Sequence, residues 1–264
     1  MIDLHCHLLP GIDDGATDLD DALALARVAW EDGITTLACT PHIYPGLYDN
    51  TAEIIHDGVA SLQDELAKAD IPLTLVAGAD AQLTPNMLEQ LKTGRIPTLA
   101  GSRYFLFEPP HHVAPPRMAD VIFQLLAAGY VPIITHPERL TWIEDRYATI
   151  CEVFEAGAWI QLTAGSITGL FGKRALYWSE RMLDEGRVHI VASDGHNLRR
   201  RRPVLSEARE RVADRLGQQA ALDMVSIRPQ GVILDHSPTD MPALTKARRP
   251  VEQPARRRWF GGFR

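Results

Sequence analysis

Seven short apolar runs recur along this chain with amphipathic stretches between them, and this alternation most constrains the fold. The runs are continuously apolar for the most part, as is typical of parallel strands covered on both faces. They span residues 2–5, 36–39, 73–77, 104–107, 131–135, 159–162 and 188–192. The stretches between them predict helices over residues 18–32, 51–69, 117–128, 146–156, 173–185 and 206–216. Because most of these helices stop at a glycine before the next strand, the sequence predicts an α/β fold with seven parallel strands.

Length and composition are those of an ordinary globular protein. The 264 residues are 45% apolar and 23% charged, and no linker interrupts the pattern before about residue 238. We therefore expect one domain over residues 1–238 and a basic, flexible tail over residues 239–264. Three widely spaced cysteines and the lack of a secretory signal predict a cytoplasmic protein without disulfides.

The net charge of −7 is unevenly distributed. Residues 246–264 carry seven basic side chains and one acidic one, a charge of +6, which leaves about −13 for the rest of the chain. An acidic body argues against general nucleic-acid binding. The run Arg256-Arg257-Arg258-Trp259-Phe260 could contact the anionic inner face of a membrane, or it could be a solvated chain end.

Six of the seven predicted strands end in side chains that can bind metal ions. Strand side chains have a period of two, so His5 and His7 lie on one face, and Asp194 and His196 repeat that spacing. In a β/α barrel the carboxyl ends of the strands converge on one face, where active sites are built. We therefore expect one site that includes His5, His7, His42, Asp80, Glu108, His136, Asp194 and His196.

A ninth ligand is expected from the loop over residues 10–15. This loop contains two adjacent carboxylates, of which one would bind metal and the other would cap the turn or the following helix. Residue type does not separate them, and we assign Asp14 as the ligand. For the next helix, Thr17 and Asp18 are both candidate N-caps.

Nine ligands are too many for one ion and suit two or three ions with shared carboxylates. Imidazoles and carboxylates without thiolates favour Mn, Zn or Fe. Two members have a purely structural alternative: His42 could be a turn residue, and His136 could be a core histidine bonded to backbone. Glu108 is harder to explain as structure, since an unpaired buried carboxylate is costly.

Cysteine-based phosphatase chemistry is excluded by the sequence, because that chemistry needs a Cys-x5-Arg loop. The residues six positions after the three cysteines are Ile12, Pro45 and Gly157. Three other histidines, His56, His189 and His236, fall outside the pattern and are predicted to be structural.

The ligand set resembles that of the polymerase and histidinol phosphatase (PHP) superfamily. The finer resemblance is to its bacterial tyrosine-protein phosphatases of capsular and exopolysaccharide loci, and it covers about residues 1–235. It rests on the segments around His5-Cys6-His7, on Thr135-His136-Pro137-Glu138-Arg139, on residues 161–166 with Phe171-Gly172, and on residues 193–197. It implies a distorted, TIM-like (β/α)7 barrel and a site with up to three ions, most often manganese, with Zn, Fe or Mg as alternatives.

The resemblance also implies a reaction and a partner. The reaction is hydrolysis of phosphotyrosine by a metal-activated hydroxide, and the partner is a membrane-associated tyrosine autokinase that controls polysaccharide export. By position we expect Arg139 and one of residues 199–202, with Arg202 favoured, to bind the phosphoryl oxygens. One position departs from the family, because Asp80 stands where we expect a bridging glutamate. The spacing of one metal pair is therefore in question.

Four other readings stay open at this point. The first is a PHP phosphatase of a small phosphate monoester such as histidinol phosphate, which would use the same site. A metal-dependent amidohydrolase also begins with His-x-His, although no predicted strand here ends in the lysine that many of them carry. The others are a PHP-type exonuclease, disfavoured by the acidic body, and a protein that retains only part of the site. The oligomeric state is open.

Overall fold

The seven apolar runs all form parallel strands, and two of them continue into a second short strand. The computed structural model describes residues 1–247. The strands are β1 (Ile2–Cys6), β2 (Thr36–Cys39), β3 (His42–Ile43), β4 (Thr74–Ala77), β5 (Asp80–Gln82), β6 (Tyr104–Glu108), β7 (Val131–Thr135), β8 (Trp159–Thr163) and β9 (Ile190–Ala192). The short strands β3 and β5 follow Pro41 and Gly78, two residue types that interrupt a ladder. The predicted α/β class is confirmed.

The strands form two sheets that share chain segments. One has the order β1-β2-β4 and the other has the order β3-β5-β6-β7-β8-β9. Strand β2 of the first sheet leads directly into β3 of the second, and β4 leads into β5 in the same way. The two sheets are therefore joined at these two places. Strand β1 also meets the loop after β9, where the N–H of Asp194 donates to the carbonyl of His5 at 2.8 Å and the N–H of His7 donates to that of Gly195 at 2.9 Å. The carboxyl ends of the strands therefore open onto a common region.

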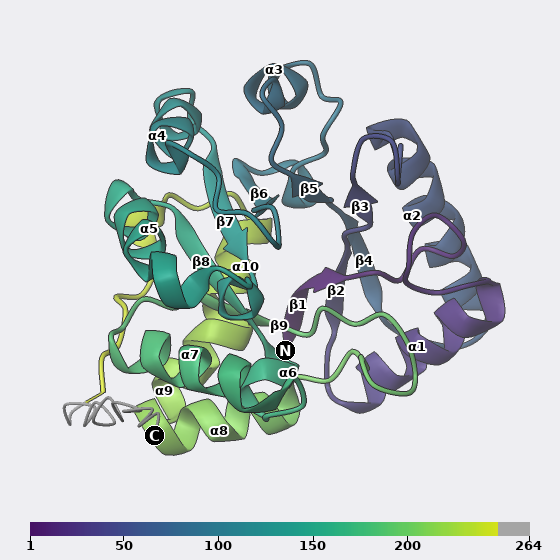
Figure 1. The fold of residues 1–264 in the computed structure, drawn as a ribbon. Coiled ribbons are helices and arrows are strands. Elements are labelled where there is room, and N and C mark those ends of the chain that lie inside the picture. Colours follow the sequence, from purple (N-terminus) through teal and green to yellow (C-terminus); the bar gives the residue numbers. More distant parts are fainter. Residues whose placement is uncertain (248–264) are drawn as a thin grey trace, which may run out of the picture.

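All six predicted helices are present, and they surround the strands (Figure 1). The helices are α1 (Leu19–Glu31), α2 (Ala52–Lys68), α3 (Met87–Lys92), α4 (Met118–Ala127), α5 (Ile143–Ala156), α6 (Ala164–Ile167), α7 (Gly172–Asp184), α8 (Ser206–Leu216), α9 (Gln218–Leu222) and α10 (Arg228–Ile233). Asp18, not Thr17, caps α1 by accepting from the N–H of Asp21 at 2.9 Å. The additional helices have four to six residues, which is too short for a periodic pattern to predict.

Strands β1, β6, β7, β8 and β9 are buried on both faces, as their apolar composition predicts. In β6, Phe105 and Phe107 belong to the large core between strands and helices. Tyr104 and Leu106 alternate with them and belong to a second cluster, which also includes Val232 of α10. Apolar packing thus fills the body of the fold and leaves the polar side chains at the carboxyl ends of the strands.

Residues 239–247, the described part of the predicted tail, make hydrogen bonds with the body of the fold. The buried Arg228 donates to the carbonyl oxygens of Pro242 and Ala243 at 3.3 and 2.9 Å. The N–H of Ala247 donates to the carbonyl of Asp184 at 3.2 Å. Residues 248–264, with the arginine run at 256–258, lie outside the described residues. Within residues 1–247, no helix combines the length and the apolar composition needed to cross a bilayer.

Candidate metal centre

The structure brings all nine predicted ligands together at the carboxyl ends of the strands. Three groups place their ligand atoms within 4.8 Å of one another: His7, Asp14, His42 and His196; His5, His7 and Asp80; and His42, Asp80 and Glu108. His136 and Asp194 complete the cluster through contacts with these groups. Because several members belong to two groups, the arrangement suits more than one ion.

Two buried carboxylates each lie among three imidazoles. The Oδ1 atom of Asp194 lies 3.5 Å from a ring nitrogen of each of His5, His7 and His196. The Oδ2 atom of Asp80 lies 3.5 Å from His5 Nε2 and His42 Nδ1, and 3.7 Å from His136 Nε2. A carboxylate in such a position can bridge two cations.

Asp14 and Glu108 are the more accessible carboxylates of the cluster. The Oδ1 atom of Asp14 lies 3.3 Å from His196 Nε2 and 3.6 Å from His42 Nε2. The Oε2 atom of Glu108 lies 3.5 Å from His42 Nδ1. The ring of His42 is thus placed between both carboxylates, which does not fit a simple turn residue.

Several buried polar atoms of the predicted ligand residues have no hydrogen-bond partner among the described residues. They are His42 Nδ1, both carboxylate oxygens of Asp80, His136 Nδ1 and His196 Nε2. Leaving such atoms unpaired is costly, so their concentration at one place fits a donor set for divalent cations. The alternative for His136, a core histidine bonded to backbone, does not fit its unpaired Nδ1 atom.

The backbone is strained at two of the ligands. His136 and Asp194 have φ angles of 36° and 53°, in the left-handed region that residues with a Cβ atom rarely adopt. Each follows a strand end, β7 or β9. Strain of this kind persists where the surroundings fix a side chain in a required direction.

Asp13 holds two of the histidines in place. Its Oδ2 atom accepts hydrogen bonds from His7 Nδ1 at 2.6 Å and from the N–H of His42 at 3.1 Å. Its Oδ1 atom accepts from the N–H of Gly15 at 2.9 Å. An added Cβ at Gly15 would lie 2.1 Å from the carbonyl oxygen of His7, so only glycine fits there. Asp13 therefore stabilises the turn, which is the role predicted for the carboxylate of this loop that does not bind metal. It also orients His7.

Gln161 of β8 is a supporting residue that sequence reasoning missed. The sixth strand contained no recognisable ligand, yet its only strongly polar side chain is fully buried. The Oε1 atom of Gln161 lies 2.8 Å from His5 Nδ1. An amide oxygen accepts, so Nδ1 carries the proton, and Nε2 points into the cluster, 3.2 Å from His7 Nε2, where it can bind a metal ion. A lone glutamine inside an apolar run was the available signal.

A further buried carboxylate, Asp3, links β1 to the segment after β9. It accepts hydrogen bonds from the Oγ–H and, at 3.0 Å, the N–H of Ser193, and from the N–H of His5 at 3.2 Å. Burial raises the pKa of Asp3 to about 6. These bonds fix the register of the strand that carries His5 against the segment that carries Asp194.

The pKa values of the cluster diverge because charges are concentrated and buried. Burial opposes a charge on His5, but Asp80 and Asp194 raise its pKa to about 9. Burial, then His196 and His42, lower the pKa of His7 to about 3. Burial and the neighbouring Asp80 raise the pKa of Glu108 to about 9. Such divergence is typical of functional sites.

Two arginines meet at Asp194, and one of them differs from the prediction. Arg139 Nη1 donates to Asp194 Oδ2, and Arg201 Nη2 donates to the same oxygen at 2.7 Å. Arg202 is exposed and lies on another pocket. The structure thus places Arg139 at the site as expected but replaces Arg202 by Arg201, because the turn at residues 197–201 directs neighbouring side chains in opposite directions.

The cysteines are not placed as nucleophiles. Cys6 is fully buried and donates to the carbonyl of Gly195 at 3.4 Å, and burial raises its pKa. Burial also raises the pKa of Cys39. Neither thiol would be ionised near neutral pH.

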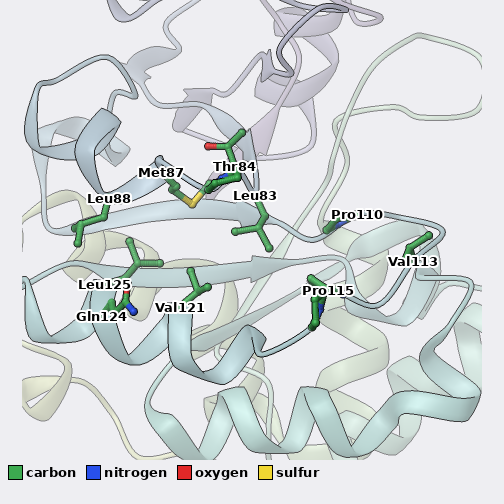
Figure 2. Close-up of a pocket in the computed structure, with 12 residues that line it drawn as sticks. Leu83, Thr84, Met87, Leu88, Pro110, Val113, Pro115, Val121, Gln124 and Leu125 are labelled. Carbon is green, nitrogen blue, oxygen red and sulfur yellow. The ribbon is translucent and has the colours of Figure 1, made fainter.

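An apolar pocket of about 390 Å³ adjoins the ends of β5 and β6. Figure 2 shows Leu83, Met87 and Leu88 on one side and Val121 and Leu125 of α4 on the other. The N–H of Leu83 donates to the carbonyl of Glu108 at 3.0 Å, so the pocket begins beside a predicted ligand.

Comparison with known proteins agrees with this geometry. The tyrosine-protein phosphatase YwqE of Bacillus subtilis is 36% identical over 201 residues, which are 76% of this chain and 79% of that protein. The tyrosine-protein phosphatase CpsB of Streptococcus pneumoniae is 30% identical over 244 residues, 89% of this chain and 99% of that protein.

Solved structures give the same result. A crystal structure from work on YwqE and CpsB, described there as unique metal-dependent tyrosine phosphatases, superimposes on this chain with a TM-score of 0.87. The two sequences are 31% identical, and the match covers 96% of this chain and 100% of the other. A β-aspartyl dipeptidase from Fervidobacterium islandicum AW-1 reaches a TM-score of 0.52 at 16% identity, over 88% of this chain and 72% of its own, and shares the fold alone. Residues 1–234 match the family described as "Capsular polysaccharide synthesis, CpsB/CapC", and the chain belongs to this family.

Proposed function

We propose that this protein is a metal-dependent protein-tyrosine phosphatase. The observation that carries the proposal is the cluster of five imidazoles and four carboxylates, in which buried atoms of His42, Asp80, His136 and His196 have no hydrogen-bond partner among residues 1–247. Two arginines beside this cluster add the positive charge that a phosphoryl group requires. Relatives of 30–36% identity carry the name tyrosine-protein phosphatase.

The residues of the site have separate tasks. The nine ligand side chains would hold two or three divalent ions, most readily manganese. Ions bound there supply Lewis-acid polarisation of phosphoryl oxygens and lower the pKa of water. Arg139 and Arg201 bind the phosphoryl oxygens and stabilise the charge that grows on them, while Asp13 and Gln161 keep the rings of His7 and His5 oriented.

The leaving group is a phenolate, which needs little help from an acid. A phenol has a pKa of about 10, well below that of an alkyl alcohol. Asp80 is one methylene shorter than the glutamate expected at its position, so we infer a closer approach of its backbone to the ions or a changed preference among metals.

The wider role follows from the family. We infer that the substrate is a phosphotyrosine protein, a membrane-associated tyrosine kinase of polysaccharide synthesis, and that the phosphatase acts in the cytoplasm. We also infer that the seven strand positions form the distorted (β/α)7 barrel of PHP proteins. The parallel ladders and the contacts between β1 and the segment after β9 support this inference.

The test is hydrolysis of a phosphotyrosine peptide by the purified protein. Activity should vanish with a chelator, return with Mn, and resist thiol alkylation. Metal analysis on the same sample gives the identity and number of ions. Activity that survives chelation but not alkylation would contradict the proposal, and a strong preference for histidinol phosphate or phosphoserine would reassign the substrate.

A further inference from the structure

The four-arginine run at residues 199–202 is divided between two places. Arg201 turns inward to Asp194. Arg199, Arg200 and Arg202 line a separate pocket of about 230 Å³ between α6 and the loop that leads to α8. The run is therefore not one solvated basic loop, because its members serve different surroundings.

The pocket combines positive charge with apolar walls. Leu170 and Val204 contribute apolar surface, and Glu207 is the one carboxylate among the lining residues. The Oε1 atom of Glu207 lies 3.8 Å from Nη2 of Arg211, a residue that does not line the pocket. Three arginines against one partly paired glutamate leave the pocket positive, in a protein whose net charge is −7.

The loop that presents the arginines is organised without a ligand. The Oδ1 atom of Asn197 accepts from the N–H groups of Arg199, Arg200 and Arg201 at 3.1, 3.0 and 3.3 Å. The N–H of His196 donates to the carbonyl of Arg201 at 2.7 Å. A pre-formed loop loses less conformational entropy when it binds a partner.

Two contacts link the surroundings of the pocket to those of the metal centre. On the loop side, Pro203 packs so closely on Gly195 that an added Cβ there would lie 2.9 Å from it. On the other side, Gly165 and Leu170 line the pocket, and the next residue, Phe171, lies under the guanidinium of Arg139 at 4.6 Å. A polypeptide with its phosphotyrosine at Arg139 and Arg201 can therefore reach the pocket with a nearby side chain.

We propose that this pocket is a second anion subsite, which binds an acidic residue flanking the phosphotyrosine in the substrate polypeptide. The inference rests on the proposed phosphatase function and specifies its substrate. The reacting phosphate occupies Arg139 and Arg201, and the three outer arginines, which form no ion pair within residues 1–247, can bind a second negative group. The acidic surface of the rest of the protein repels an acidic substrate polypeptide, whereas the three arginines attract it to the pocket.

The test compares phosphotyrosine peptides that differ only in glutamate or glutamine at the flanking positions, with an aryl phosphate as the small reference substrate. The wild-type protein should show a higher kcat/KM for the acidic peptide, mainly through KM, and added salt should reduce this preference. In the variant R199E/R200E/R202E the ratio of acidic to neutral kcat/KM should fall about tenfold, since exposed charge pairs contribute about 1.4- to 5-fold each. Arg146→Glu, an exposed charge reversal on α5 away from the pocket lining, is the control and should keep the wild-type ratio.

Equal kcat/KM for both peptides in the wild-type protein would overturn the subsite, while hydrolysis of both would leave the phosphatase function intact. Absence of metal-dependent activity on every phosphotyrosine substrate would instead overturn the function itself. A triple variant that loses binding to anionic lipid vesicles but keeps the peptide ratio would assign the arginines to a membrane and also refute the proposal.

Discussion

The Nδ1 atom of His7 lies 2.6 Å from the Oδ2 atom of Asp13, whose carboxylate also accepts from the N–H of His42. This bond fixes the ring so that Nε2 faces the cluster. A carboxylate in this position also raises the basicity of the imidazole. Asp13 thus affects the proposed metal site through two histidines.

Replacement of Asp13 by Asn should therefore weaken metal binding although Asp13 is not assigned as a ligand. We expect a loss of about 10- to 100-fold in affinity, measured by titrating Mn into the metal-free protein. Asp18→Asn, which keeps an effective N-cap on α1, should leave the affinity unchanged. An Asp13→Asn protein with wild-type affinity would show that His7 does not need this partner.

Gln161→Leu should release the ring of His5. The variant fills a similar volume but removes the Oε1 acceptor 2.8 Å from His5 Nδ1. We expect metal affinity to fall by about 10-fold or more, and Gln161→Glu, which keeps the acceptor, to lose less. The two variants are compared by metal titration and by thermal unfolding without metal. Equal affinities would mean that the hydrogen bond has no role in orienting the ligand.

Arg201 and Arg202 are neighbours with different expected effects. Loss of a donor to developing charge costs about 10²–10³ in rate, so Arg201→Ala should lower kcat/KM for an aryl phosphate to about that extent. Arg202→Ala should change it no more than about twofold, since its side chain lies on the outer pocket. Steady-state kinetics on both variants decide the point, and the reverse order of effects would restore Arg202 to the site.

His189 should make stability depend on pH without taking part in the site. Its Nδ1 atom accepts from the N–H of Ile160 at 3.1 Å, its ring stacks on Trp159, and burial followed by Arg228 lowers its pKa to about 3. A lowered folded-state pKa gives stability that is complete above the unfolded value of about 6.5 and is lost as the pH falls toward 3.

We therefore expect this histidine to account for about 2 kcal/mol of the loss in free energy of unfolding between pH 7 and pH 4, after allowance for its partial exposure. His189→Asn should be less stable at pH 7 but should lose less on acidification. Urea unfolding at both pH values measures the difference. Identical losses in both proteins would indicate that His189 is protonated in the folded state.

Local sequence patterns were enough to predict the helices, the strands and the types of ligand. Strand and helix periods are local properties, so apolar runs and terminal glycines placed all seven strand positions and six helices close to their observed bounds. The i, i+2 spacing placed His5 with His7, and the convergence of parallel strand ends predicted that His42, Glu108 and His136 would join them.

The partners of these residues depend on the assembled fold and could not be predicted from local patterns. Asp13 and Asp14 are adjacent carboxylates, and Arg201 and Arg202 are adjacent guanidinium groups, so composition and spacing could not separate them. Their directions are set by the loops at residues 10–15 and 197–201, which have no repeating side-chain period. Gln161 meets His5 across 156 residues. Such a contact exists only once β8 and β1 are assembled, because hydrogen bonding depends on distance and direction in space rather than on position along the chain.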